Sequence, residues 1–300
     1  MTDPRYTVAV SNHNMVDTVR ASLTSVLEQI DSRFEVVVID DGSDDGSERV
    51  LRELETEYES LRVVYNAGND NLGEARNHSF RVANGEYILS AVDTDDQFTH
   101  VLQDFVALYE EIAADLSRDF LLLGGGLYMA PRSLVLETPY RSLGYGEDRD
   151  FYRRMLAQDA LISLSHTPFR FSIGYNRSLS ERLQIGVKTI AVQFRSGVAF
   201  WPYIKWAAEE LRGDRDRIGP FRAVGHLLLA PVAYLLSFLG PRYDAPEAYT
   251  DIGRYKQELR DVHRTLTGLE ERFDISVDRK QLGQRGRALF DINERDQVLD

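Results

Sequence analysis

The sequence predicts an α/β fold, with a doubly wound, mainly parallel sheet and helices on both of its faces. Three observations lead to this prediction. Apolar runs and amphipathic segments alternate regularly over the first hundred residues. The apolar runs are nearly continuous, as in parallel strands covered on both faces. Acidic residues directly follow two of these runs, and the carboxyl ends of parallel strands are where such folds bind ligands.

Four strands and four helices are expected in this first part of the chain. The strands are apolar runs bounded by polar or turn residues: Thr7–Ser11, Phe34–Ile39, Leu61–Tyr65 and Glu86–Val92. The helices repeat apolar residues at intervals of three and four: Thr18–Gln29, Ser47–Glu59, Gly73–Ala83 and Thr99–Leu116. Asp44 or Ser47 is available to cap the second helix, because short polar side chains accept from free backbone N–H groups.

The pattern changes after residue 120, where Gly124-Gly125-Gly126 interrupts the alternation. Three later elements are expected to be helical or amphipathic: Glu147–Gln158, Lys188–Leu211 and Ile252–Arg272. From Ala223 to Pro241 the chain carries no formally charged residue. We therefore expect four parts: an α/β domain at 1–170, an amphipathic region at 171–220, a hydrophobic segment at 221–241 and a charged helical tail at 242–300.

The composition excludes several classes of function. A net charge of −13, from 35 basic and 48 acidic residues, argues against nucleic acid as a partner, because phosphate binding needs a basic surface. The absence of cysteine excludes disulfides, zinc–thiolate sites and thiol nucleophiles. Only four of the basic residues are lysines. A surface rich in acids and poor in lysine is typical of proteins adapted to a very salty cytoplasm, but an ordinary acidic protein explains it equally well. No signal peptide precedes the first strand, so we expect the α/β domain in the cytoplasm.

Carboxylates gather at three places in the sequence. Asp40-Asp41 and Asp93-Thr94-Asp95-Asp96 end two expected strands, and Glu147-Asp148 with Asp150 follows later. Carboxylates at one sheet edge repel each other unless a cation or polar ligand compensates, and two of them one residue apart can share a hard cation. Each cluster also has a simpler explanation. The first could cap a helix, the second could be a random acidic loop, and the third could be acids in the first turn of a helix. Together these residues predict a site for a metal-bound nucleotide.

The loop after the first strand, Ser11-Asn12-His13-Asn14, lacks the glycine patterns of dinucleotide-binding and P-loop proteins. Small polar residues there can instead hydrogen-bond a base or a ribose. The segment VVVIDDGSDDGS has the early spacing of a calcium loop, but its twelfth position is Arg52, which excludes that site. The acidic clusters therefore carry the functional prediction.

Five motifs in order resemble those of family 2 glycosyltransferases of the GT-A fold: TVAVSNHN, FEVVVIDDGSDDGS, NLGEARN, GEYILSAVDTDD and GYGEDRDFYRR. The resemblance covers about residues 6–160. It implies that Ser11 and Asp41 lie beside the nucleotide base and that Arg76 lies near the base or the diphosphate. It also implies that Asp93 contacts the ribose or the metal, and that Asp95 is the direct ligand of Mg²⁺ or Mn²⁺.

The same resemblance implies an inverting transfer from a nucleotide sugar, with UDP as the family's commonest nucleotide. Asp148, in the pair Glu147-Asp148, would be the base that takes the proton from the acceptor hydroxyl as it attacks the sugar. Two alternatives stay open: a non-catalytic sugar- or lipid-binding scaffold of the same fold, and a nucleotidyltransferase that makes nucleotide sugars. The second class usually has a glycine-rich basic loop after the first strand, which this chain lacks.

The charge-free segment 223–241 reaches the length of a bilayer-crossing helix, about 18 residues. The alternative is a buried helix, and His226 and Pro231 count against spanning. Aromatic residues from Phe194 to Trp206 favour the boundary between water and lipid. We expect this region to bind the cell membrane, either spanning it or lying in the interface, with the α/β domain on the cytoplasmic face. The chain then resembles haloarchaeal glycosyltransferases of surface-protein N-glycosylation, which implies an acceptor linked to a dolichyl or polyprenyl phosphate.

Overall fold

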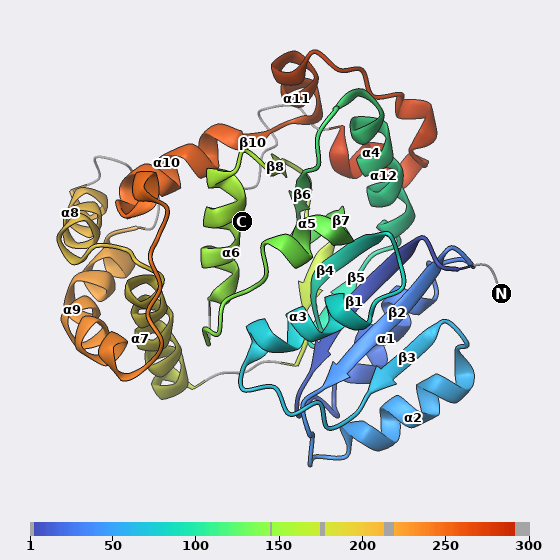
Figure 1. Ribbon diagram of the computed structural model, residues 1–300, viewed down its shortest axis with the longest axis horizontal. Coiled ribbons are helices and arrows are strands. Elements are labelled where there is room, and N and C mark those ends of the chain that lie inside the picture. The colour runs from blue at the N-terminus through green and yellow to red at the C-terminus, as the bar shows by residue number, and fades with distance from the viewer. Residues whose placement is uncertain (1–2, 145, 175–177, 213–218, 292–300) are drawn as a thin grey trace.

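The computed structural model describes residues 3–144, 146–174, 178–212 and 219–291. Its main sheet has the strand order β10-β8-β6-β7-β4-β1-β2-β3 (Figure 1). The four strands expected from the sequence lie together and parallel in it: β1 (Tyr6–Asn12), β2 (Phe34–Asp40), β3 (Leu61–Val64) and β4 (Tyr87–Asp93). The predicted α/β fold with a mainly parallel sheet is therefore confirmed.

Helices cover both faces of this sheet, because side chains of each strand point alternately to opposite sides. One core contains Val8 and Val10 of β1 and apolar residues of α1 (Val19–Leu27), α2 (Ser47–Glu57) and α4 (Leu102–Asp115). The opposite core contains Ala9 of the same strand with residues of α3 (Leu72–Val82), α5 (Arg132–Glu137) and α6 (Glu147–Ala157). All seven residues of β1 are buried, which explains its continuous apolar run.

The sheet continues beyond residue 120. β6 (Leu121–Gly124) and β7 (Leu127–Pro131) form an antiparallel hairpin, and β8 (Leu161–Leu164) runs parallel to β6. The triple glycine makes the hairpin turn: Gly126 has φ +71°, and a Cβ there would lie 2.2 Å from the guanidinium of Arg170. Arg170 belongs to β9 (Arg170–Ser172), which pairs with β5 (Asp96–Phe98) in a small second sheet.

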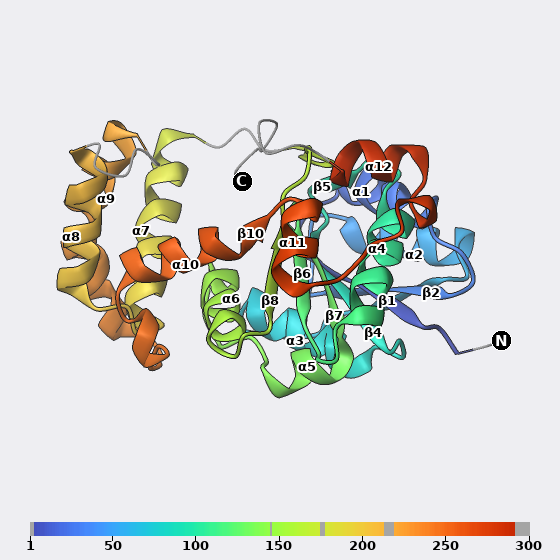
Figure 2. The ribbon, with the colours of Figure 1, turned by 90° about the horizontal axis from the view of Figure 1, so that it is seen from above.

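Three helices form a separate layer beside the sheet: α7 (Leu179–Arg195), α8 (Phe200–Leu211) and α9 (Pro220–Leu236), the last followed by the 3₁₀ turn η1 (Ser237–Leu239). Both views show this layer standing away from the main sheet (Figure 1, Figure 2). The amphipathic stretch expected at 188–211 is thus two helices. They separate at Gly197, whose φ of +91° and close contact with the backbone nitrogen of Ala245 leave no room for a side chain.

The tail differs from its prediction. The helical region expected over Ile252–Arg272 is interrupted, because His263 and Arg264 form β10 and extend the sheet beside β8. The 3₁₀ turn η2 (Glu247–Tyr249) and helix α10 (Ile252–Val262) precede β10. Helix α11 (Leu266–Phe273), the 3₁₀ turn η3 (Arg279–Gln281) and helix α12 (Gln284–Phe290) follow it. Leu266 and Phe290 are fully buried in the core beside α4, so residues 263–290 complete the α/β domain (Figure 2).

Candidate active site

A cavity of about 780 Å³ lies at the carboxyl ends of β1, β2 and β4. Its inner wall comes from these strand ends and from the loop before α3, and its outer wall from α7 and the end of α9. The residues that line it are Ser11, Asn12, His13, Met15, Asp41, Asn69 to Leu72, Asp93 to Asp95, Gly144, Lys188, Ala191, Val192, Arg195, Leu236, Leu239 and Gly240. Four predicted site residues, Ser11, Asp41, Asp93 and Asp95, therefore share one cavity.

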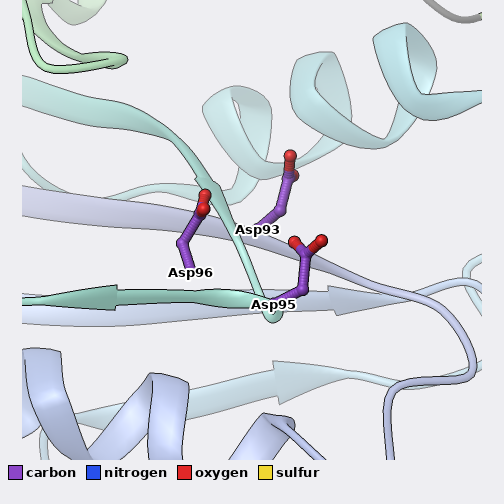
Figure 3. A group of neighbouring side chains, drawn as sticks. All are labelled: Asp93, Asp95 and Asp96. Carbon is purple, nitrogen blue, oxygen red and sulfur yellow. The ribbon is translucent and has the colours of Figure 1, made fainter. Parts of the chain in front are cut away.

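Three carboxylates converge on the loop between β4 and β5. Oxygen atoms of Asp93, Asp95 and Asp96 lie within 4.8 Å of one another, and the three side chains point in the same direction (Figure 3). Burial raises the pKa of Asp96 to about 6; the ion pair with Arg170 at 3.3 Å opposes this shift, and the charges of Asp93 and Asp95 add to it. Such crowded carboxylate oxygens fit a hard divalent cation such as Mg²⁺ or Mn²⁺.

The buried acid at the end of β2 has a structural role. Asp40 is 1% exposed and accepts hydrogen bonds from the Asn12 amide (2.6 Å) and the Ser43 hydroxyl (2.6 Å). The oxygen of the same Asn12 amide accepts from the hydroxyl of Thr94 at 2.7 Å. This chain of bonds connects the ends of β1 and β2 to the loop that carries the metal-ligand candidates. From the sequence, Asn12 was expected only as one of the small polar residues that could hydrogen-bond a base or a ribose, and its structural role had no signal beyond its place at the end of a buried strand.

Asp41 faces the cavity instead. Its Oδ1 accepts from the side-chain amide of Asn69 at 2.6 Å and from the backbone N–H of Asn69 at 3.3 Å. Its Oδ2 accepts from no residue in the described part of the chain. Asn69 thus holds one carboxylate oxygen and leaves the other for a ligand. Contact of Asp41 with a base remains a prediction.

Arg76 lies beneath the cavity rather than in its wall. It is 5% exposed, and its Nη2 lies 3.3 Å from Asp93 while its Nε lies 3.3 Å from Glu147. Glu147 is 3% exposed; burial raises its pKa to about 7, although the charge of Arg76 opposes the shift. Arg76 therefore connects the carboxylate cluster to the start of α6. Neither Arg76 nor Glu147 is among the lining residues, and direct contact with a nucleotide stays a prediction for Arg76.

Helix α6 begins after Gly146, whose φ is +86°, and carries the third acidic cluster in its first turn. Asp148 is half-buried, its Oδ1 accepts from the backbone N–H of Arg149 at 2.9 Å, and it is not among the cavity-lining residues. Asp150 is fully buried between Arg141 (3.1 Å) and Arg154 (2.9 Å), which makes it structural. Tyr145 of the same motif lies outside the described residues. The role of Asp148 as a base stays a prediction.

The outer wall contains residues that were not named as site residues from the sequence, although the amphipathic region at 171–220 was expected on the acceptor side. Lys188, Ala191, Val192 and Arg195 of α7 line the cavity together with Leu236 and Leu239. The spacing of the four α7 residues places them on one helix face, which is the signal that could have grouped them. The cavity therefore has an acidic inner wall and an outer wall that combines two cations with leucines.

The comparisons with known proteins agree with this geometry. The family model described as glycosyl transferase family 2 matches residues 7–184, which is more than half of the chain. The chain belongs to glycosyl transferase family 2. The matched residues run from the second residue of β1 to beyond β9 and contain every acidic cluster described above. The GT-A expectation from the motifs is thereby confirmed at the level of family and fold.

Relatives share this part of the chain. An uncharacterized glycosyltransferase of Nostoc sp. is 32% identical over 108 residues, which are 35% of this chain and 33% of that protein. The match thus spans about a third of the relative's length. Glucosyl-3-phosphoglycerate synthase from Mycobacterium tuberculosis, with Mn²⁺, UDP and phosphoglyceric acid, has a TM-score of 0.51 at 20% identity, over 66% of this chain and 80% of that one. S. aureus TarS 1-349 with UDP-GlcNAc has a TM-score of 0.50 at 17% identity, over 90% and 83%.

Proposed function

We propose that this family 2 member is a metal-dependent, inverting glycosyltransferase that moves a sugar from a nucleotide sugar to an acceptor. The observation that carries the proposal is the cluster of Asp93, Asp95 and Asp96, of which Asp93 and Asp95 line a 780 Å³ cavity. Asp41, which follows β2, lines the same cavity. A non-catalytic scaffold has no need to hold three mutually repelling carboxylates so close together.

The donor in this proposal is UDP-linked, because two proteins of similar fold hold UDP or UDP-GlcNAc in their structures. Asp93 and Asp95 would hold Mg²⁺ or Mn²⁺, and the bound ion would neutralise charge that develops on the diphosphate. Ser11 lines the same cavity, and in this proposal Oδ2 of Asp41 accepts a hydrogen bond from a base N–H. Arg76 acts in this scheme as a positioning residue, because its contacts are Asp93 and Glu147.

The chemistry follows from one proton transfer and one displacement. Asp148 takes the proton from the acceptor hydroxyl, and the hydroxyl oxygen attacks C1 of the sugar. The bond between C1 and the phosphate oxygen breaks on the opposite face, and its electron pair leaves with the nucleotide diphosphate, so the anomeric centre is inverted. Glu147 and Arg76 fix the first turn of α6, from which Asp148 projects.

The acceptor in this proposal is a glycan linked to a dolichyl or polyprenyl phosphate, at the cytoplasmic face of the cell membrane. The outer cavity wall supports this choice, since Lys188 and Arg195 suit a phosphate and Leu236 and Leu239 suit a hydrocarbon chain. The setting in this proposal is glycosylation of surface proteins in a salt-adapted host, with which the acidic, lysine-poor composition is compatible.

A thermal-shift screen of nucleotide sugars with Mn²⁺ tests the proposal, because a ligand of the native state raises the melting temperature. We expect a UDP-sugar to stabilise the protein only with the ion, and the bound donor to be hydrolysed slowly. Asp95→Asn should lose both effects, whereas Asp150→Asn, in a buried ion pair outside the cavity, should keep the ion requirement. A donor that binds equally well without a metal and is never hydrolysed would contradict the proposal.

A further inference from the structure

The outer face of α9 is apolar and uncovered. Six large apolar side chains, each 40% to 92% exposed, repeat at intervals of three and four residues: Phe221, Val224, Leu228, Val232, Leu235 and Leu239. This spacing places them along one side of the helix, and we call them the α9 stripe. Pro220–Leu239 has the length and composition to cross a membrane, yet only 22% of its most apolar window is buried in the protein.

The opposite face of α9 is fixed to the protein. Ala223, Ala230 and Ala233 are fully buried, and the last two pack in the core formed with α7 and α8. The hydroxyl of Tyr203 in α8 lies 2.6 Å from Nδ1 of His226 in α9. To cross a bilayer, α9 would have to break this packing or draw the charged residues of α7 and α8 into hydrocarbon, which is unfavourable. These contacts suit a helix that lies along a surface.

The charge around the stripe differs from that of the whole chain. The described residues between 178 and 242 include seven basic and three acidic ones, whereas the full chain has 35 basic and 48 acidic ones. Arg222 and Arg242, at the two ends of the stripe, are both exposed. A second copy of the chain would place this positive region against itself, whereas anionic lipid headgroups attract it. Charge complementarity therefore selects a lipid surface as the partner.

The stripe also reaches the candidate active site. Leu239 belongs to the stripe and lines the cavity, and the neighbouring Leu236 and Gly240 line it too. A surface that covers the stripe would therefore meet the cavity at this edge. Lys188 and Arg195 line the same cavity from α7, within reach of a phosphate that enters there.

We propose that α9 lies flat on an anionic membrane as an interfacial helix, and that a lipid-linked acceptor enters the cavity sideways between Leu236, Leu239 and Gly240. The entry route rests on the proposed function, whereas the docking does not. An amphipathic helix of this kind buries its apolar face to the level of the headgroups and upper acyl chains, and its binding depends on anionic lipid. The catalytic domain then stays on one side of the bilayer.

Vesicle sedimentation tests the docking. We expect the protein to pellet with vesicles of phosphatidylglycerol and phosphatidylcholine, and to pellet much less with phosphatidylcholine alone. The double variant Leu228→Ser, Leu235→Ser should bind anionic vesicles at least about tenfold more weakly, because two exposed apolar side chains leave the stripe. Leu136→Ser, at a 39% exposed site on α5, is the matched control and should bind as the unmodified protein does. Equal binding by both variants, or dimer formation without vesicle binding, overturns the proposal.

A depth measurement separates a flat helix from a spanning one. The chain has no cysteine, so Phe221→Cys, Leu228→Cys and Leu235→Cys can each carry a single spin label. Phe221 and Leu235 are about 21 Å apart along a helix. A flat α9 gives similar depths at all three sites, whereas depths that differ by roughly that distance overturn the proposal. Hydrolysis of the nucleotide sugar by the protein without vesicles tests the proposed function separately. If no hydrolysis occurs, the proposed function is contradicted and the docking result is unaffected.

Discussion

Replacing Arg76 with methionine should destabilise the protein in a pH-dependent way. Arg76 is the buried cation between Glu147 and Asp93, at 3.3 Å from each. Removing one partner of a buried ion pair costs about 3–5 kcal/mol. Most of this loss should come from Glu147, whose side chain is 4% exposed, whereas that of Asp93 is 34% exposed and partly solvated. Methionine keeps a similar unbranched shape, so packing losses stay small.

The pH dependence follows from Glu147. In the folded protein burial raises the pKa of Glu147 to about 7, above its ordinary value. A group with a raised folded pKa loses its stabilising contribution as pH rises through that value. Without Arg76 the pKa of Glu147 rises further. Each unit of this rise lowers the free energy of unfolding by about 1.4 kcal/mol more at a pH where Glu147 is ionised. Arg76→Met should therefore lose more stability at pH 8 than at pH 6, where Glu147 can be neutral.

Urea denaturation at both pH values measures the effect. The double variant Arg76→Met, Glu147→Gln should regain much of the loss at pH 8, because no buried charge is left uncompensated. Arg49→Met, at an exposed i,i+4 pair with Glu53, is the matched control and should be nearly neutral. If Arg76→Met matches the unmodified protein at pH 8, or Glu147→Gln restores nothing, the ion-pair explanation is refuted.

Three further predictions concern the loop, the hairpin and the base. Asn12→Ala should cost about 1–3 kcal/mol in urea unfolding and weaken Mn²⁺ binding, because buried Asp40 and Thr94 lose a shared partner; unchanged metal affinity would show that the bond network does not position the loop. Gly126→Ala should lower the melting temperature, since the φ of +71° strains any residue with a Cβ and the Arg170 guanidinium would also have to move; an unchanged melting curve contradicts this. Asp148→Asn should abolish transfer to a lipid-linked sugar hydroxyl and spare much of the transfer to a lipid monophosphate, which is already ionised; equal loss with both acceptors rules out a base.

The fold could be predicted from the sequence where the hydrophobic period was long and regular. β1 to β4 and the intervening helices follow from apolar runs and helical spacing, and they place Asp41, Asp93 and Asp95 at one sheet edge. The two-residue strand β10 could not be predicted, because His263-Arg264 is too short to show the alternation of apolar and polar residues that indicates a strand. It joins the sheet only by pairing with β8.

The contacts within the site were less predictable. Asp40 and Asp41 look equivalent in the sequence, but Asp40 is the last residue of β2 and is buried, whereas Asp41 follows the strand and faces the cavity. Arg76 and Glu147 are far apart in the chain, and a single sequence gives no signal for pairing them. The exposure of the α9 stripe likewise depends on α7 and α8 covering only the alanine face.

The most direct measurement is calorimetric titration of UDP into the protein with and without Mn²⁺, repeated with Asp93→Asn and Asp95→Asn. If the acidic cluster holds an ion that binds the diphosphate, UDP should bind the unmodified protein far more tightly with Mn²⁺. Both variants should lose this dependence while their thermal unfolding stays cooperative. Folded variants in which Mn²⁺ still strengthens UDP binding to the same extent would place the ion elsewhere and contradict the account.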